Sequence, residues 1–121
     1  MATCLIADDS KVIRLLLSKI MSNLGFSVIE AEDGEDVVEQ TQIKEPDLII
    51  MDWNLPVLDG IDAFYKIKEL KLERTPKVIF CSSVSDPERI AQAINGGVDD
   101  YIMKPFDEDI VSTKLTILGL L

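Results

Sequence analysis

Short apolar runs, rich in β-branched residues and bounded by acidic or turn-forming residues, recur along the chain. Such runs predict strands buried on both faces, because a strand with one face in water would alternate apolar and polar positions. Five strands are predicted in this way, at Thr3 to Ala7, Val28 to Ala31, Leu48 to Met51, Val78 to Cys81 and Tyr101 to Met103.

The segments that follow these runs carry residues at helical spacing, which predicts five helices. The residues that show this spacing are Val12, Leu15, Leu16, Lys19 and Ile20; Val37, Val38 and Thr41; Ile61, Phe64 and Ile67; Ile90, Ala91 and Ile94; and Ile110, Lys114 and Ile117. Strands that alternate with helices indicate a parallel sheet covered on both faces, the doubly wound α/β class.

Turn-forming residues mark the boundaries of several predicted helices. Gly25 is placed to end the first helix, Pro46 stops the second, and Asn95 to Gly97 end the fourth. Asp86 to Glu88 combine a capping residue, a proline in the first turn and an acid, which together start a helix. The boundaries therefore agree with the apolar pattern.

Length and composition predict one domain that spans residues 1–121. Of the 121 residues 47% are hydrophobic, enough for one core but not for a second folding unit. The formal net charge of -10 argues against nucleic acid as a direct partner, because phosphates repel so acidic a surface. Mg²⁺ or a basic partner face is more compatible with this charge.

The two cysteines and the absence of long apolar stretches bear on the compartment. Cys4 and Cys81 lie in apolar runs, where an unpaired cysteine packs as a small hydrophobic residue, so a reducing cytoplasm is expected. The sequence shows neither a signal peptide nor a stretch of about 18 uncharged apolar residues, so no membrane span is expected.

Polar residues that can bind ions or react follow four of the predicted strands. They are Asp8 and Asp9 after the first strand, Asp52 after the third, Ser82 and Ser83 after the fourth, and Lys104 after the fifth. Because open α/β sheets bind ligands beyond the carboxyl ends of their strands, these side chains are expected to converge on one rim. Taken singly, each has an ordinary role as a cap, a turn residue or a solvated charge. Together they favour a functional site.

Three crowded carboxylates repel one another unless a cation neutralises them. A hard divalent ion fits this need, and Mg²⁺ commonly binds through one or two carboxylates while keeping water and phosphate in its shell. Asp52 then stays ionised and is the candidate nucleophile toward a phosphoryl group. Lys104 and Ser82 are placed to neutralise and hydrogen-bond the phosphoryl oxygens.

Four segments resemble the signature blocks of CheY-like response-regulator receiver domains. They are Leu5 to Ser10, Ile50 to Gly60, Cys81 to Ser83 and Tyr101 to Phe106. The resemblance covers nearly the whole chain and is specific, because an acidic pair, an Asp-x-x-x-Pro-x-x-Asp-Gly block, a hydroxyl residue and Lys-Pro occur in the family's order. It implies a flavodoxin-like (βα)5 sandwich with the strand order 2-1-3-4-5, and the function of a two-component phosphoacceptor switch.

The resemblance also implies how Mg²⁺ and the phosphoryl group are bound. Asp52 would be the phosphoacceptor, and Mg²⁺ would be held by Asp9, Asp52 and the backbone carbonyl of Asn54, with Asp8 acting through water. The resemblance further implies that Ser82 and Lys104 bind the phosphoryl group. Ser82 and Tyr101 would be the switch residues that respond to it.

The family further suggests a cis bond between Lys104 and Pro105. The chain departs from the family at Ser82, where threonine is commoner, and at Leu55, where methionine is usual; neither change removes chemistry. Trp53 beside the acceptor is less usual, and we expect its indole to be partly exposed and to cover the sheet edge more than to contact a partner.

Three other functions remain as alternatives. A haloacid-dehalogenase-like phosphatase would need a second acidic residue at position 54, where Asn54 cannot shuttle protons. A flavodoxin-like cofactor protein would place a phosphate near Asp8 and Asp9, which would repel it, and no Gly-rich loop is present. A pseudo-receiver that keeps the fold only for protein contacts is disfavoured by the intact acidic triad, hydroxyl and lysine.

The resemblance also implies the partners. The phosphodonor would be a histidine kinase or a histidine phosphotransfer protein, and a downstream protein or effector domain would contact the fourth helix, fifth strand and fifth helix. The chain would catalyse only its own phosphorylation and dephosphorylation, and is not expected to be an enzyme with external substrates. No effector segment follows the fifth helix, so both a stand-alone regulator and the N-terminal part of a longer one remain open.

Overall fold

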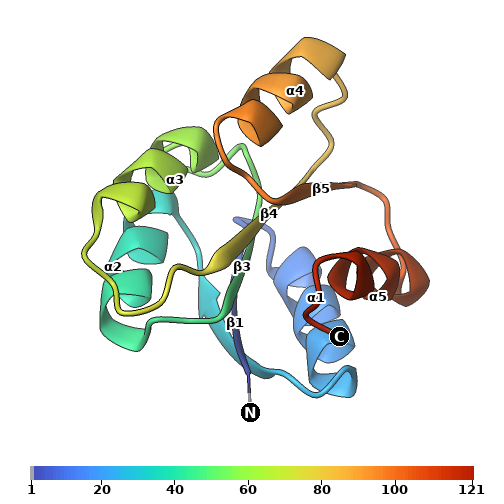
Figure 1. Ribbon diagram of the computed structural model, residues 1–121. Helices are drawn as coiled ribbons and strands as arrows, with labels where there is room; N and C mark the ends of the chain where they lie inside the picture. The colour runs from blue at the N-terminus through green and yellow to red at the C-terminus, as the bar shows by residue number, and fades with distance from the viewer. Residues whose placement is uncertain (1) are drawn as a thin grey trace.

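Five parallel strands form one sheet in the computed structural model, which describes residues 2–121 (Figure 1). They are β1 (Thr3–Ala7), β2 (Ser27–Ala31), β3 (Leu48–Met51), β4 (Lys77–Ser82) and β5 (Asp100–Met103). Their order across the sheet is β2-β1-β3-β4-β5, which confirms the predicted fold class. Each strand equals the predicted apolar run or extends it by one residue, at one end in β2 and β5 and at both ends in β4.

A helix follows each strand, and the helices cover both faces of the sheet. They are α1 (Lys11–Asn23), α2 (Gly34–Lys44), α3 (Gly60–Glu69), α4 (Pro87–Asn95) and α5 (Glu108–Ile117). Figure 1 shows α1 and α5 on one side of the sheet and α2 and α3 on the other. Side chains of α4 join those of α2 and α3 in the core on that second side.

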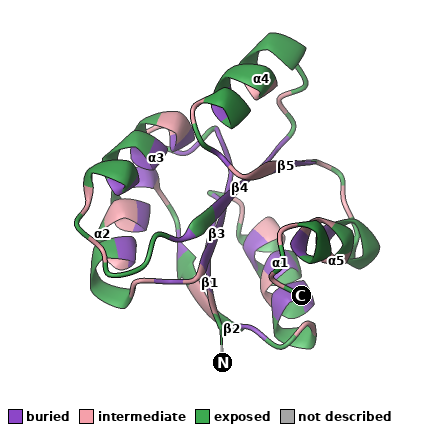
Figure 2. Ribbon diagram, in the orientation of Figure 1, coloured by how far each residue is buried: buried purple, intermediate pink, exposed green. Residues whose placement is uncertain are grey.

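The sheet separates two hydrophobic clusters. Alternate residues of one strand enter opposite clusters: Ile49 of β3 packs with the α2–α4 side and Ile50 with the α1 and α5 side. Both residues are completely buried, as a strand covered on two faces requires. Figure 2 accordingly shows β1, β3 and β4 largely buried inside helices whose outer faces are exposed, whereas the edge strand β2 is mostly intermediate or exposed.

The residues that showed helical spacing in the sequence match the buried faces of α1 and α5 only in part, at Ile20 of α1. In α1, Leu17 and Met21 are buried, whereas Val12 and Leu15 are 73% and 57% exposed. This helix carries apolar residues around more than one face, so spacing locates the helix without selecting the face that meets the sheet. In α5 the buried residues are Val111 and Leu115, and Ile110 and Ile117 are exposed.

The predicted helix boundaries are confirmed by the capping geometry. Asp86 is the N-cap of α4, with Pro87 in the first turn, and its carboxylate accepts a hydrogen bond from the Glu88 amide. Gly25, just after α1, has a φ of 95°, a left-handed conformation that glycine adopts without a Cβ clash. The caps fix where each loop at the carboxyl edge of the sheet enters its helix.

Two further expectations concern cysteine and apolar length. Cys4 and Cys81 are both buried and free, as their apolar surroundings predicted. Among the helices of residues 2–121, none combines the length and the hydropathy that a bilayer crossing requires.

Candidate functional site

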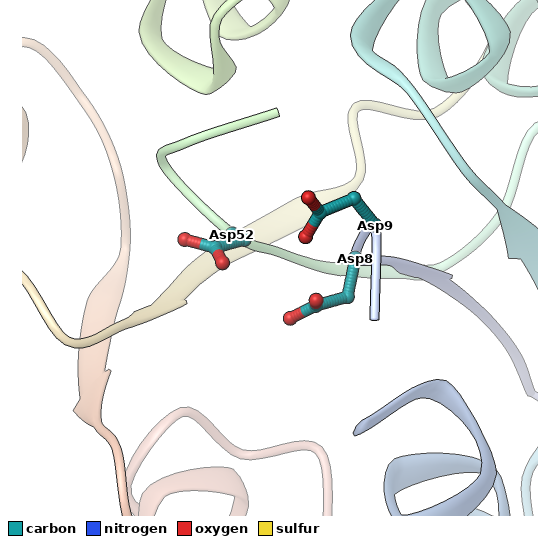
Figure 3. Close-up of side chains that lie close together, drawn as sticks. All are labelled: Asp8, Asp9 and Asp52. Atoms are coloured by element: carbon teal, nitrogen blue, oxygen red, sulfur yellow. The ribbon is translucent and has the colours of Figure 1, made fainter. Parts of the chain in front are cut away.

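Three aspartates meet beyond the carboxyl ends of β1 and β3, as the strand-end pattern predicted. Oxygens of Asp8, Asp9 and Asp52 all lie within 4.8 Å of one another. Asp8 and Asp52 are buried, with 1% and 8% of their surfaces exposed, and Asp9 is exposed. Figure 3 shows the three side chains leaving two neighbouring strand ends. A small cation can therefore reach all three carboxylates from the solvent side of Asp9.

Backbone pairing fixes the relative height of the two strand ends. Ala7 and Met51 are partners in the register of β1 and β3, and the Asp52 amide donates to the Ala7 carbonyl at 2.9 Å. The residues that follow each strand, Asp8 and Asp52, are therefore brought to the same level of the rim. The turn beyond Asp8 is closed by the Ser10 amide, which donates to Asp8 Oδ1 at 2.9 Å.

Lys104 supplies a cation inside this acidic group. Its Nζ lies 2.6 Å from Asp8 Oδ2 and 2.9 Å from Asp52 Oδ2. Burial alone would lower the pKa of Lys104, but hydrogen bonds to the two carboxylates and their negative charge outweigh it, so the pKa is raised. Lys104 therefore provides part of the neutralising charge that the sequence argument assigned to a metal ion.

The oxygens that Lys104 leaves free accept backbone hydrogen bonds. Asp52 Oδ1 accepts from the Asn54 amide at 3.1 Å, and Asp8 Oδ1 is the acceptor of the Ser10 amide. Both buried carboxylates are thus held by two donors each, which fixes their orientation. Asp9 has no hydrogen-bonded partner for its carboxylate among residues 2–121.

Ser82 and Tyr101 lie on the neighbouring strands of the same rim. Ser82 is completely buried at the end of β4, and its hydroxyl accepts a hydrogen bond from the Val84 amide at 3.4 Å. The Tyr101 hydroxyl donates to the Val84 carbonyl at 2.6 Å, so both predicted switch residues contact the same loop. Burial raises the pKa of Tyr101, and the charge of Asp52 adds to this effect.

Trp53 is buried, and the expectation that its indole is partly exposed was wrong. Only 4% of its surface is exposed, because the ring packs on Phe80 at 5.2 Å and the Arg89 guanidinium covers it at 4.5 Å. The cation over the ring face is a favourable cation–π contact. Trp53 instead belongs to the core cluster on the α2–α4 side of the sheet.

Four neighbouring residues complete the description of the rim. The bond between Lys104 and Pro105 is cis, as the family resemblance suggested. Ser83 and Asn54 are exposed. Cys81 lies beside the site, but burial raises the pKa of its thiol to about 12, so it stays protonated near neutral pH and does not compete as a nucleophile.

Sequence reasoning missed Arg14, a buried cation on α1. It is 8% exposed, and its Nη1 donates to the backbone carbonyl of Asp8 at 2.7 Å. The sequence does show an arginine one turn into the helix that follows Asp8 and Asp9. The direction of its side chain was not predictable, because the sequence did not indicate which face of α1 meets the sheet.

Comparison with known families decides the identity of this arrangement. The response regulator receiver domain model matches residues 4–116. The chain belongs to this receiver family. It is thus a CheY-like receiver domain of two-component systems, a class of phosphoacceptor signalling domains that interact with histidine kinases and downstream effectors. The phosphatase and flavin-binding alternatives are set aside by this membership.

Relatives and solved structures support the same assignment over nearly the full length. The chemotaxis protein CheY of Bacillus subtilis (strain 168) is 37% identical over 108 residues, which cover 88% of each chain. CheY of Halobacterium salinarum is 37% identical over 116 residues, 93% of this chain and 95% of the relative. The receiver domain of a sensor histidine kinase from Pseudomonas aeruginosa PAO1, solved with magnesium coordinated in its active site cleft, superposes with a TM-score of 0.84 at 25% identity and covers 98% of both chains.

Proposed function

We propose that Asp52 accepts a phosphoryl group in a Mg²⁺-dependent reaction, and that a partner protein or effector domain reads the phosphorylated state. The observation that carries this proposal is the placement of the Asp52 carboxylate, which lies within 4.8 Å of oxygens of Asp8 and Asp9 and 2.9 Å from the Lys104 ammonium. A carboxylate kept ionised beside cations is able to attack phosphorus. Asp8 contacts the same ammonium, but both of its carboxylate oxygens are engaged by Lys104 and Ser10 and it is only 1% exposed, whereas Asp52 is 8% exposed.

The donor set fits Mg²⁺, a hard cation that prefers oxygen ligands and binds proteins through few carboxylates. Asp9 and Asp52, with the backbone carbonyl of Asn54, would hold the ion, and Asp8 would act through water. The exposed carboxylate of Asp9 has no competing partner among residues 2–121, which leaves it available as a ligand. When bound, the ion would neutralise charge on the transferring phosphoryl group.

The chain's own residues would orient the nucleophile and stabilise the product. An Asp52 oxygen forms a bond to phosphorus as the bond to the donor's leaving atom breaks, and the donor keeps that electron pair. Lys104 already contacts Asp52 Oδ2, so its ammonium is within reach of phosphoryl oxygens placed on Asp52. Ser82 and Tyr101 would then shift the loop that both contact, which biases an existing two-state equilibrium.

An exposed apolar surface beside the site supports a protein as the phosphodonor. Val12, Leu15 and Leu16 of α1 are 73%, 57% and 42% exposed on the helix that begins just after Asp9. A histidine kinase or phosphotransfer protein would cover these apolar side chains while it brings its phosphohistidine to Asp52. The chain would catalyse only the gain and loss of its own phosphoryl group.

Substitution of Asp52 tests the proposal. Asp52→Asn should reduce acid-labile phosphate incorporation from acetyl phosphate to background, because the amide is not a nucleophile, and wild type should lose incorporation when Mg²⁺ is chelated. Asp62→Asn, which removes an exposed aspartate of α3, is the matched control and should label like wild type. Wild-type labelling of Asp52→Asn would place the acceptor elsewhere.

A further inference from the structure

Arg14 is a buried arginine whose contacts lie next to the acidic rim. Arginine is almost never fully buried unless its charge is paired, so a burial of this degree calls for specific partners. Its Nε lies 3.2 Å from Glu30 Oε1, its Nη2 lies 3.6 Å from Glu32 Oε1, and its Nη1 donates to the Asp8 carbonyl at 2.7 Å. One guanidinium therefore joins α1, the end of β2 and the loop after β1.

The contact with the Asp8 carbonyl is the tightest of the three. The glutamate side chains are 45% and 78% exposed, and ion pairs so open to water contribute little. The carbonyl contact is fully buried and charge-assisted, which makes it roughly twice as strong as a neutral hydrogen bond. Arg14 therefore acts mainly on the backbone of the loop after β1.

That carbonyl belongs to the peptide plane between Asp8 and Asp9. A peptide unit is planar, so a bond that fixes the Asp8 carbonyl also fixes the Asp9 amide and restricts the direction in which the Asp9 side chain leaves the backbone. Asp8 and Asp52 are held by Lys104, but the Asp9 carboxylate has no hydrogen-bonded partner among residues 2–121. Among the polar contacts of the rim, those of the backbone are therefore the ones that restrict the Asp9 side chain.

We propose that Arg14 is a positioning residue for the Mg²⁺ site, which fixes the peptide plane between Asp8 and Asp9 so that the Asp9 carboxylate faces Asp52. This inference rests on the proposed Mg²⁺ function of the acidic rim. Arg14 does not touch the ion or the reacting atoms; it acts through the loop. Loss of the guanidinium should leave the charges of the three aspartates unchanged, but should free the Asp9 carboxylate to move out of its place facing Asp52.

The sign of the effect separates positioning from simple electrostatics. Removal of a cation near a divalent ion strengthens metal binding through the Coulomb interaction, and the released Glu30 and Glu32 charges act in the same direction. If Arg14 positions Asp9, its removal should instead weaken Mg²⁺ binding by about tenfold, as substitutions of groups that orient metal ligands do. A weaker site in Arg14→Met is therefore opposite to what the change of charge predicts.

The experiment measures Mg²⁺ affinity by calorimetry and by the amide chemical shifts of Asp8 to Ser10. Arg14→Met should raise the Kd for Mg²⁺ about tenfold. Arg14→Lys, which keeps the positive charge but loses the planar guanidinium, should raise the Kd for Mg²⁺ as well. Glu30→Gln leaves the carbonyl contact intact and should bind Mg²⁺ like wild type. Arg74→Met removes an exposed cation that pairs with Asp47, and is the control for net charge.

The outcomes are distinguishable. Affinity in Arg14→Lys that is equal to or tighter than wild type would overturn the inference, and this variant serves even if Arg14→Met fails to fold. A loss of affinity in Glu30→Gln as large as that in Arg14→Lys would also overturn it, because the pairing of α1 with β2 would then be responsible. If wild type itself binds no Mg²⁺, or Asp9→Ala binds as well as wild type, the proposed function fails instead.

Discussion

Val57 adopts a backbone conformation that suits its side chain poorly. It has a φ of 69°, and the Leu58 amide donates to the Pro56 carbonyl at 2.7 Å around it, which closes a three-residue turn. β-Branched residues rarely occupy the left-handed region, because Cβ approaches the following carbonyl. Since Val57 is also 72% exposed, burial offsets little of this strain.

Val57→Asn should therefore raise the free energy of unfolding by about 1 kcal/mol, because asparagine tolerates the left-handed region. Urea denaturation monitored by circular dichroism measures the change. Val12→Asn, an equally exposed position on α1, is the control and should not stabilise the protein. An unchanged or lower stability of Val57→Asn would show that the turn does not carry this strain.

Lys104 links the site to the stability of the fold. Its pKa is raised in the folded protein by Asp8 and Asp52, so its contribution is complete below the unfolded-state pKa and is lost as pH rises through the folded-state pKa. In metal-free buffer, the free energy of unfolding of wild type should fall above about pH 10, and Lys104→Met should show a shallower fall. The exposed Lys71→Met is the control. Equal slopes for wild type and Lys104→Met would contradict the assignment.

At the scale of elements, the strands were predictable and the helix faces were not. A strand such as β3, buried on both faces, leaves a continuous apolar run that is visible in the sequence. Helix α4 buries only Ala93, and Ile94 is 40% exposed, so its apolar residues do not report which face meets the sheet. The direction of a helix face depends on tertiary contacts, which apolar spacing does not encode.

The loop between β4 and α4 is the element through which the site is expected to signal. Ser82→Ala should bind Mg²⁺ like wild type, because the hydroxyl is assigned to the phosphoryl group. When loaded with beryllium fluoride, which stands in for the aspartyl-phosphate, this variant should show smaller amide shifts at Tyr101 and α4 than wild type does.

Ser83→Ala, which changes the exposed neighbouring hydroxyl, is the matched control and should respond fully. Full shifts in Ser82→Ala would refute the relay. Loss of Mg²⁺ binding in Ser82→Ala would instead show that the roles within the site are divided wrongly.

At the scale of the whole molecule, the site was predictable because parallel strands end at one edge. Asp8, Asp9, Asp52 and Lys104 were expected on one rim because each follows a predicted strand, and the fold brings them there. The cover of Trp53 by Arg89 was not predictable, because it depends on where α4 lies relative to the sheet. The expectations on compartment and nucleic acid stay predictions.

The central claim is that Asp52 carries the phosphoryl group. Wild-type protein phosphorylated by acetyl phosphate in Mg²⁺ can be reduced with borohydride, which converts an aspartyl-phosphate to homoserine, and the position of the homoserine is then read by peptide mass spectrometry. The account predicts homoserine at position 52 alone, and none when Mg²⁺ is chelated. Homoserine at position 8 or 9, or a labelled protein without homoserine, would contradict it.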